Sequence, residues 1–131
     1  MEKKTILVVE DENKVRQDLC DTLRGVGYHI HEAANGKTGL QAYAEFGPNL
    51  IITDIAMPDV DGIELIRTIR NTNLDIPIIA ISSAWEYLEV AYLFGANKAF
   101  YKPLQQNLFL SSVQKLLDVP NKLQESLKHL I

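Results

Sequence analysis

The sequence predicts a doubly wound α/β fold, in which helices cover both faces of a parallel β-sheet. Five short apolar runs alternate along the chain with five segments whose apolar residues recur at helical spacing. Most of these runs contain almost no polar residue, which is typical of strands buried on both faces of a sheet. Five successive strand–helix units of this kind predict a flavodoxin-like sheet with the strand order 2-1-3-4-5.

The strands are predicted from runs of β-branched and other apolar residues. TILVV near the start of the chain and PIIAI in its second half are the clearest examples. The second run, YHIHEA, is more polar, so this strand is expected at an edge of the sheet. The predicted strands occupy residues 5–9, 28–33, 49–53, 77–81 and 99–101.

The helices are predicted from apolar residues three or four positions apart. Val15, Leu19 and Leu23 form such a stripe in the first helix, and Gly27 ends it. The predicted helices occupy residues 13–26, the stretch between the Asn35-Gly36 turn and Gly47-Pro48, and residues 63–70, 86–94 and 105–117.

The composition is that of one ordinary globular domain. Of the 131 residues, 47% are hydrophobic and 23% are charged, so the chain is able to bury a core of its own. We assign residues 1–118 to this domain and residues 119–131 to a C-terminal tail, for which a short helix after Pro120 is one option. The formal net charge of −4 and the lack of a basic stripe argue against nucleic-acid binding by this chain. No apolar run is long enough for a signal peptide or a membrane span.

Cysteine and histidine usage gives two further expectations. Cys20 is the only cysteine, which excludes an internal disulfide and fits a reducing, cytoplasmic location. It lies in the first helical stripe, so we expect a buried, unreactive thiol. His29 and His31 lie on one face of the predicted edge strand. A metal site is the alternative there, but no third ligand is evident, and we expect solvated polar side chains.

Five polar residues follow the predicted strands at the carboxyl end of the sheet, where doubly wound folds bind their ligands. These residues are Glu10, Asp11, Asp54, Ser82 and Lys102. Three carboxylates close together repel one another unless a cation lies among them, and oxygen ligands of this kind suit Mg²⁺. The lysine and the serine hydroxyl suit phosphoryl oxygens. A carboxylate can attack phosphorus to form an acyl phosphate, and Asp54, central in this group, is the predicted nucleophile.

Most of these residues, and two further acids nearby, also have an explanation that needs no ligand. The acids at residues 10–12 lie at a predicted helix start, where the helix dipole favours negative charge. Asp59 and Asp61 are expected to be turn and helix-start residues rather than phosphate ligands. Ser82 alone fits an ordinary strand end, and Lys102 alone fits a solvated charge. Their common edge of the sheet with the predicted nucleophile makes them site candidates.

Four motifs follow one another in the sequence: VVEDE (8–12), TDIAMPDVDG (53–62), PIIAISS (77–83) and GANKAFYKPL (95–104). Together they resemble the CheY-like receiver domain of two-component response regulators, over roughly residues 4–118. The resemblance implies a phospho-acceptor aspartate, a Mg²⁺ site completed by a backbone carbonyl, a switch hydroxyl and a phosphate-pairing lysine. By this resemblance Asp54 is the phospho-acceptor, Ser82 is the switch hydroxyl and Lys102 is the phosphate-pairing lysine. The Mg²⁺ ligands implied are Asp11 and Asp54 directly, Glu10 through water, and the backbone carbonyl of Ala56.

By this resemblance the chain is a phospho-acceptor switch and not an enzyme in the ordinary sense, although it promotes its own phosphorylation and dephosphorylation. The resemblance implies Mg²⁺ as cofactor and a sensor histidine kinase or phosphotransfer protein as phosphate donor. It also implies an unidentified downstream protein that binds the phosphorylated form. Neither nucleic acid nor membrane is expected to contact this chain. A homodimer through the fourth helix, the fifth strand and the fifth helix is left open.

The sequence departs from the family pattern at two places that concern switching. The family usually has an aromatic residue three positions before the lysine, where this chain has Ala99. The stretch from Ser82 to Gly95 is also shorter than the resemblance implies. We therefore expect the output to run through Trp85 or Tyr101. The departures leave open an alternative function, a docking module of the same fold that needs no phosphorylation.

Two other functions of this architecture are disfavoured by single positions. An aspartyl phosphatase needs a second acid two residues after its nucleophile, where this chain has Ala56. A flavin-binding electron carrier needs a phosphate loop rich in hydroxyl groups and glycine after the first strand. The acids at residues 10–12 are a poor host for a phosphate group.

Overall fold

The computed structural model describes residues 3–57 and 61–118. These residues form one parallel sheet with the strand order β2-β1-β3-β4-β5, as predicted. The strands are β1 (Thr5–Val9), β2 (His29–Ala33), β3 (Leu50–Asp54), β4 (Ile78–Ser82) and β5 (Lys98–Tyr101). The helices are α1 (Asn13–Val26), α2 (Gly36–Phe46), α3 (Gly62–Arg70), α4 (Glu86–Phe94) and α5 (Gln106–Leu117).

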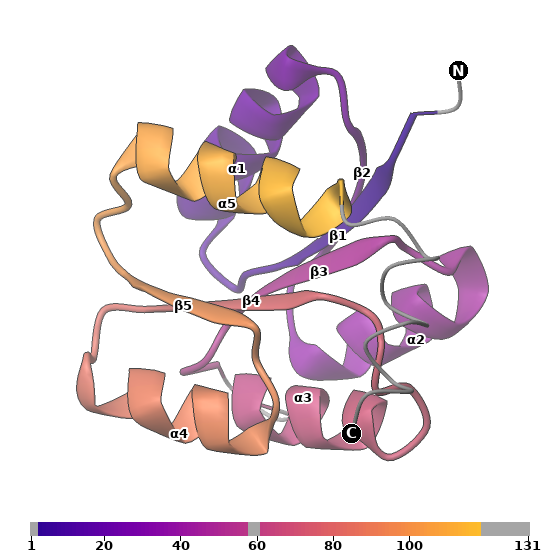
Figure 1. The fold of residues 1–131 in the computed structure, drawn as a ribbon, viewed down its shortest axis with the longest axis vertical. Helices are drawn as coiled ribbons and strands as arrows, with labels where there is room; N and C mark the ends of the chain where they lie inside the picture. The colour runs from indigo at the N-terminus through magenta and orange to yellow at the C-terminus, as the bar shows by residue number, and fades with distance from the viewer. Residues whose placement is uncertain (1–2, 58–60, 119–131) are drawn as a thin grey trace.

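Helices cover both faces of the sheet: α1 and α5 lie on one face, and α2, α3 and α4 lie on the other (Figure 1). Each face has its own apolar cluster. Because successive strand residues point to opposite faces, Ile6 and Val8 pack with α1 and α5, whereas Leu7 and Val9 pack on the other side. All residues of β3 and β4 are buried, which agrees with their predicted position in the middle of the sheet.

Strands β3 and β4 are shifted by one residue toward the C-terminus relative to the prediction, and this matters for the site. β3 and β4 both begin and end one residue later, so Asp54 and Ser82 are themselves strand residues. Asp54 aligns with Ile81 in the β3–β4 ladder, and Ser82 aligns with Tyr101 in the β4–β5 ladder. The pairing therefore holds the backbone of both polar residues in regular structure.

The helix ends are determined by local signals. Gly27 ends α1 in the left-handed conformation, with a φ of 113°. Asn35 and Gly36 are not a separate turn: Asn35 is the N-cap of α2, its side chain accepting from the Thr38 backbone N–H at 2.9 Å, and Gly36 is the first helical residue. Asp61 caps α3, which confirms its prediction as a helix-start residue.

The polar strand β2 lies at an edge of the sheet, as predicted. Its two imidazole rings meet edge to face with centroids 5.1 Å apart, and His31 stacks on Phe46 of α2 at 3.8 Å. His29 is exposed as expected, whereas His31 is half-buried, because the neighbouring helix supplies a ring that stacks on it. Within residues 3–57 and 61–118, neither histidine belongs to a group of three potential metal ligands.

Two other expectations concern the thiol of Cys20 and membrane-spanning segments. Cys20 is buried in α1 as expected, and burial is the main cause that raises the pKa of its thiol to about 12, which disfavours the reactive thiolate. In the described part of the chain no helix combines the length and apolarity needed to cross a bilayer. The tail at residues 119–131 and Asp59 lie outside the described residues.

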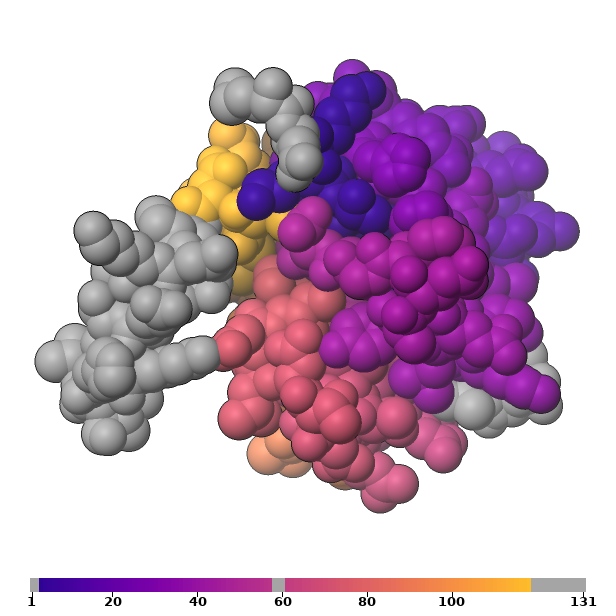
Figure 2. All heavy atoms as spheres, turned by 90° about the vertical axis from the view of Figure 1, so that its right-hand side faces the viewer, coloured from indigo at the N-terminus to yellow at the C-terminus, as the bar shows by residue number. Residues whose placement is uncertain are grey.

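The polar residues singled out from the sequence lie at one end of the sheet, the carboxyl end of its strands. The strands run from right to left in Figure 1, so their carboxyl ends lie at the left of that view. Figure 2 shows the opposite end, where segments of the first half of the chain (purple and magenta) pack directly against segments of the second half (salmon). The polar residues singled out from the sequence follow or end strands at the carboxyl end.

Candidate functional site

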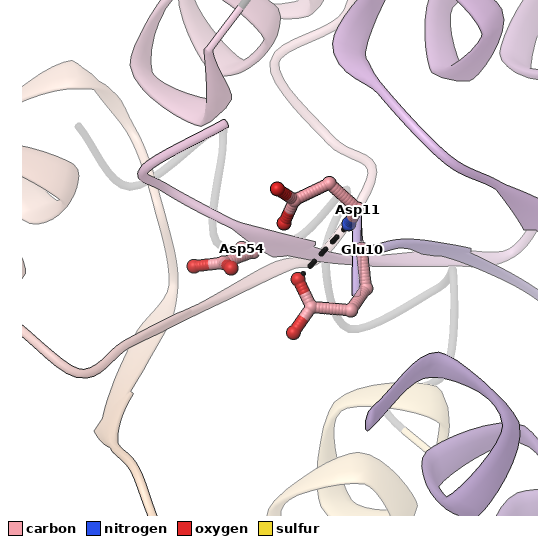
Figure 3. A group of neighbouring side chains, drawn as sticks. All are labelled: Glu10, Asp11 and Asp54. Carbon is pink, nitrogen blue, oxygen red and sulfur yellow. Dashed lines mark hydrogen bonds between the residues drawn. The ribbon is translucent and has the colours of Figure 1, made fainter. Parts of the chain in front are cut away.

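Three carboxylates converge at the carboxyl ends of the neighbouring strands β1 and β3. Glu10 and Asp11 directly follow β1, and Asp54 is the last residue of β3 (Figure 3). Each contributes one carboxylate oxygen to a set whose members all lie within 4.8 Å of one another. β1 and β3 are neighbours in the parallel sheet, so their ends lie side by side and bring together residues far apart in the sequence.

Two of these carboxylates are removed from water. Glu10 is 0% and Asp54 6% exposed, while Asp11 is exposed to solvent. A buried carboxylate is costly unless positive charge or hydrogen-bond donors meet it. The surroundings of each acid therefore determine what the site is able to bind.

Lys102, directly after β5, supplies the positive charge. Its Nζ lies 2.6 Å from Glu10 Oε1 and 3.0 Å from Asp54 Oδ2. Burial disfavours the charged ammonium group, but the hydrogen bonds to Glu10 and Asp54 outweigh it and raise the pKa of Lys102. The ammonium group therefore links the two buried acids.

Glu10 carries the strongest electrostatic perturbation at the site. Burial, followed by its interaction with Asp54, raises the pKa of its carboxyl group to about 8, although Lys102 acts in the opposite direction. The backbone holds it in place as well. Its Oε2 accepts from the Asp11 N–H at 3.1 Å, and its carbonyl accepts from the Arg16 guanidinium at 2.8 Å.

The backbone around Asp54 is held by close packing. Asp54 Oδ1 accepts from the Ile55 N–H at 2.7 Å, and the Asp54 carbonyl accepts from the Thr53 hydroxyl at 2.8 Å. α3 approaches this backbone so closely that a Cβ at Gly62 would lie 2.1 Å from the Asp54 carbonyl oxygen. Only glycine fits there without a shift of the chain.

Ser82 ends the neighbouring strand β4 and is 1% exposed. Its hydroxyl bonds to the backbone of Ala84, accepting from the N–H at 3.0 Å and donating to the carbonyl at 3.1 Å. The hydroxyl is thus at the expected edge of the sheet, but it is engaged by the loop before α4 and not by the carboxylates.

The donor set fits a divalent cation with oxygen ligands. Three acidic side chains offer oxygen atoms beside a single ammonium group, and one of them is open to solvent. Mg²⁺ prefers such oxygen ligands and retains several waters. Ala56 lies exposed two residues after Asp54, and its carbonyl as a metal ligand stays a prediction.

Sequence patterns did not point to two further contributions to this arrangement. Arg16 contacts the Glu10 carbonyl from α1 and also pairs with Glu32 at 3.2 Å. The sequence gives no signal for this, because one arginine in a helix resembles any other. The close approach of Gly62 to Asp54 was also missed, although the glycine directly after the cap residue Asp61 indicated a tight start of α3.

Comparison with known proteins is consistent with this geometry. The family model described as response regulator receiver domain matches residues 6–114. The transcriptional regulatory protein YkoG of Bacillus subtilis is 33% identical over 119 residues, which are 89% of this chain and 52% of that protein. The chain spans about half, or less, of the length of the curated relatives it matches.

Two solved structures have a similar fold. A putative response regulator from Chloroflexus aurantiacus has a TM-score of 0.85 at 28% identity, covering 90% of this chain and 100% of that one. The response regulator TrrA from Thermotoga maritima, solved in complex with Mg²⁺ and a beryllium fluoride, has a TM-score of 0.81 at 32% identity. That match covers 86% of this chain and 98% of TrrA.

Proposed function

Because this chain belongs to the response regulator receiver domains of two-component systems, we propose that Asp54 is its phospho-acceptor and that phosphorylation switches its binding to a downstream protein. The observation that carries the proposal is the Lys102 ammonium group, which lies 3.0 Å from Asp54 Oδ2 at the carboxyl end of the sheet. A positive charge at this position neutralises charge that develops on a phosphoryl group arriving at the Asp54 carboxylate.

The transfer itself forms one bond and breaks one. An Asp54 carboxylate oxygen forms a P–O bond while the P–N bond of a phosphohistidine on the donor breaks, and the electron pair of that bond stays on the imidazole nitrogen. Asp54 is well placed for this because Oδ1 is held by the Ile55 N–H while Oδ2 faces Lys102. The Ser82 hydroxyl donates a hydrogen bond to a phosphoryl oxygen after its hydrogen bond to the Ala84 carbonyl breaks.

The three carboxylates would hold Mg²⁺, with Asp11 and Asp54 as direct ligands, Glu10 acting through water and the Ala56 carbonyl completing the set. The metal would supply the additional positive charge that phosphoryl oxygens need beside two buried acids. Support comes from the clustering of the acids and from the TrrA complex, whose fold is shared.

The test is direct phosphorylation. The protein is incubated with Mg²⁺ and a small acyl phosphate donor, and the intact mass is followed with time. We expect the gain of one phosphoryl group, its loss on treatment with hydroxylamine, and no gain in Asp54→Asn. Asp61→Asn, which alters an acid only at the α3 cap, is the matched control and should still be labelled. Labelling of Asp54→Asn at the parental rate would remove Asp54 from the role.

A phosphorylation-independent docking module is the second candidate. It is favoured by Ala99, which supplies no switching ring, and by the apolar side chains that α4 exposes. Such a module would bind its partner equally well in the parent and in Asp54→Asn. A protein that takes no phosphoryl group in the assay above would support this function.

The partners follow from the same proposal. A sensor histidine kinase or a phosphotransfer protein donates the phosphoryl group, and a downstream protein reads the phosphorylated state. Self-association through α4, β5 and α5, the cytoplasmic location and the absence of nucleic-acid contacts remain predictions. Light scattering with and without a phosphate mimic tests the self-association.

A further inference from the structure

α4 buries few of its side chains against the sheet. Among its described side chains only Ala91 is buried, and the residue before the helix, Trp85, makes no side-chain capping bond. A specific polar contact exists near its C-terminal end: the Tyr92 hydroxyl accepts a hydrogen bond from the backbone N–H of Ala99 in β5 at 3.0 Å. We term this hydrogen bond the Tyr92–Ala99 latch.

The latch covers an exposed edge of the sheet. β5 is an edge strand, and the backbone N–H groups of a strand point alternately toward and away from its neighbour. The Lys102 N–H donates to the Ser82 carbonyl on β4, whereas the Ala99 N–H donates to Tyr92 instead. An aromatic ring is therefore present beside residue 99, but α4 supplies it, and it holds the backbone of that residue.

The other end of α4 is connected to the phosphorylation site. The Ser82 hydroxyl donates to the Ala84 carbonyl, and the same carbonyl accepts from the Tyr87 N–H in the first turn of the helix. A hydroxyl group has one proton. If Ser82 donates that proton to a phosphoryl oxygen on Asp54, it has to give up the Ala84 carbonyl and thereby its own link to the start of α4.

We propose that the Tyr92–Ala99 latch holds α4 in its resting position and so opposes the movement of Ser82 toward a phosphorylated Asp54. The inference rests on the proposed phospho-acceptor function and adds its regulation. Tyr92 is a positioning residue, since it acts through α4 and Ser82. In the resting arrangement the Ser82–Ala84 bond and the Tyr92–Ala99 latch are both formed, one near each end of α4. In the alternative arrangement both bonds are broken, and a phosphoryl group on Asp54 favours this second arrangement.

The size of the effect follows from the bond. A neutral hydrogen bond changes an equilibrium roughly 2- to 12-fold. When the resting arrangement predominates, a ligand of the other arrangement binds more weakly by the ratio of the two populations. Removing the latch should therefore tighten the binding of a phosphate mimic by about this factor.

The test is a titration with beryllofluoride at saturating Mg²⁺, followed by Trp85 fluorescence and, independently, by the rise in melting temperature. Tyr92→Phe removes only the hydroxyl, and we expect its half-saturation to fall roughly 2- to 12-fold below that of the parent. Tyr87→Phe is the matched control. Tyr87 lies on the same helix with 45% exposure against 48% for Tyr92, and its half-saturation should not change.

Equal or weaker binding by Tyr92→Phe would overturn the latch. A purely structural role for Tyr92 would lower the free energy of unfolding without tightening binding, so urea denaturation of both variants accompanies the titration. The coupling through Ser82 is tested in Ser82→Ala, where Tyr92→Phe should change binding little; an undiminished effect would contradict it. If the parent shows no saturable response by either readout and takes no phosphoryl group, the proposed function fails, and the latch fails with it.

Discussion

α3 and α4 are both nine residues long and follow the two neighbouring strands β3 and β4, yet they are anchored in opposite ways. α3 begins at Asp61, whose carboxylate accepts from the Glu64 N–H at 2.9 Å, and it buries three large aliphatic side chains. α4 begins without a side-chain cap and buries only Ala91. Four of its large apolar or aromatic residues are exposed instead, and Leu93 is 83% exposed.

The difference in burial suits the two helices to different roles beside the same site. α3 belongs to the core and touches the backbone of Asp54 through Gly62, so it holds the predicted phospho-acceptor in place. α4 buries a single side chain, and few buried apolar contacts make an element easy to displace. The proposed function would use both properties: an acceptor held in place and a helix that is able to move.

The largest expected effect concerns the packing of α3. Leu65→Ala should lower the free energy of unfolding by about 2–5 kcal/mol, because it leaves a cavity in the core cluster. Leu93→Ala, the same substitution on the exposed side of α4, should change it by less than about 0.5 kcal/mol. Urea denaturation followed by circular dichroism measures both. Comparable losses in the two variants would mean that α4 is anchored as firmly as α3.

A smaller effect is expected where α3 meets Asp54. Gly62→Ala places a methyl group against the Asp54 carbonyl and should cost about 1–3 kcal/mol, with weaker beryllofluoride binding because the acceptor shifts. Gly25→Ala is the matched control. Nothing lies within 4 Å of a Cβ at Gly25, which is inside α1, and this variant should be more stable by about 0.5–1 kcal/mol. A Gly62→Ala protein with parental stability and binding would contradict the close approach.

The helix starts should differ by about one capping bond. Asp61→Ala removes the cap of α3 and should cost about 1 kcal/mol, measured by urea denaturation. Trp85→Ala, before α4, removes an exposed side chain that makes no capping bond, and its effect should stay within about 0.5 kcal/mol. If both cost the same, the uncapped start of α4 is stabilised in some other way.

The smallest effect requires no substitution. Amide hydrogen exchange of the parent, followed by NMR, should show lower protection in α4 than in α3, because local opening of α4 exposes little apolar surface. Addition of Mg²⁺ and beryllofluoride should change protection in α4 more than in α3. Uniform protection of both helices would show that they open together.

Most of the architecture was predictable from local patterns. The spacing of apolar residues predicted all ten elements, and the bounds of β3 and β4 shifted by only one residue. The more polar composition of β2 predicted its edge position. The rule that parallel strands bring their carboxyl ends together was enough to group Glu10, Asp11 and Asp54.

The contacts between side chains were less accessible from the sequence. The sequence suggested a solvated environment for His31, but the residue stacks on Phe46 of α2. Ala99 was recognised as a missing ring, yet nothing indicated that Tyr92 reaches the same backbone from α4. Such contacts depend on how neighbouring elements pack, and no periodicity records them.

By itself, the sequence determined the strands, the helices, the sheet order and the set of polar residues at one edge of the sheet, because hydrophobic period and strand ends are local properties. Only the tertiary structure decided that Lys102 lies between Glu10 and Asp54, that Gly62 touches the Asp54 backbone and that Tyr92 holds β5. The Lys102–Glu10 contact joins residues 92 positions apart. The physical reason is that the partner of a buried charge or an edge amide is whichever group the packed elements bring within hydrogen-bond distance.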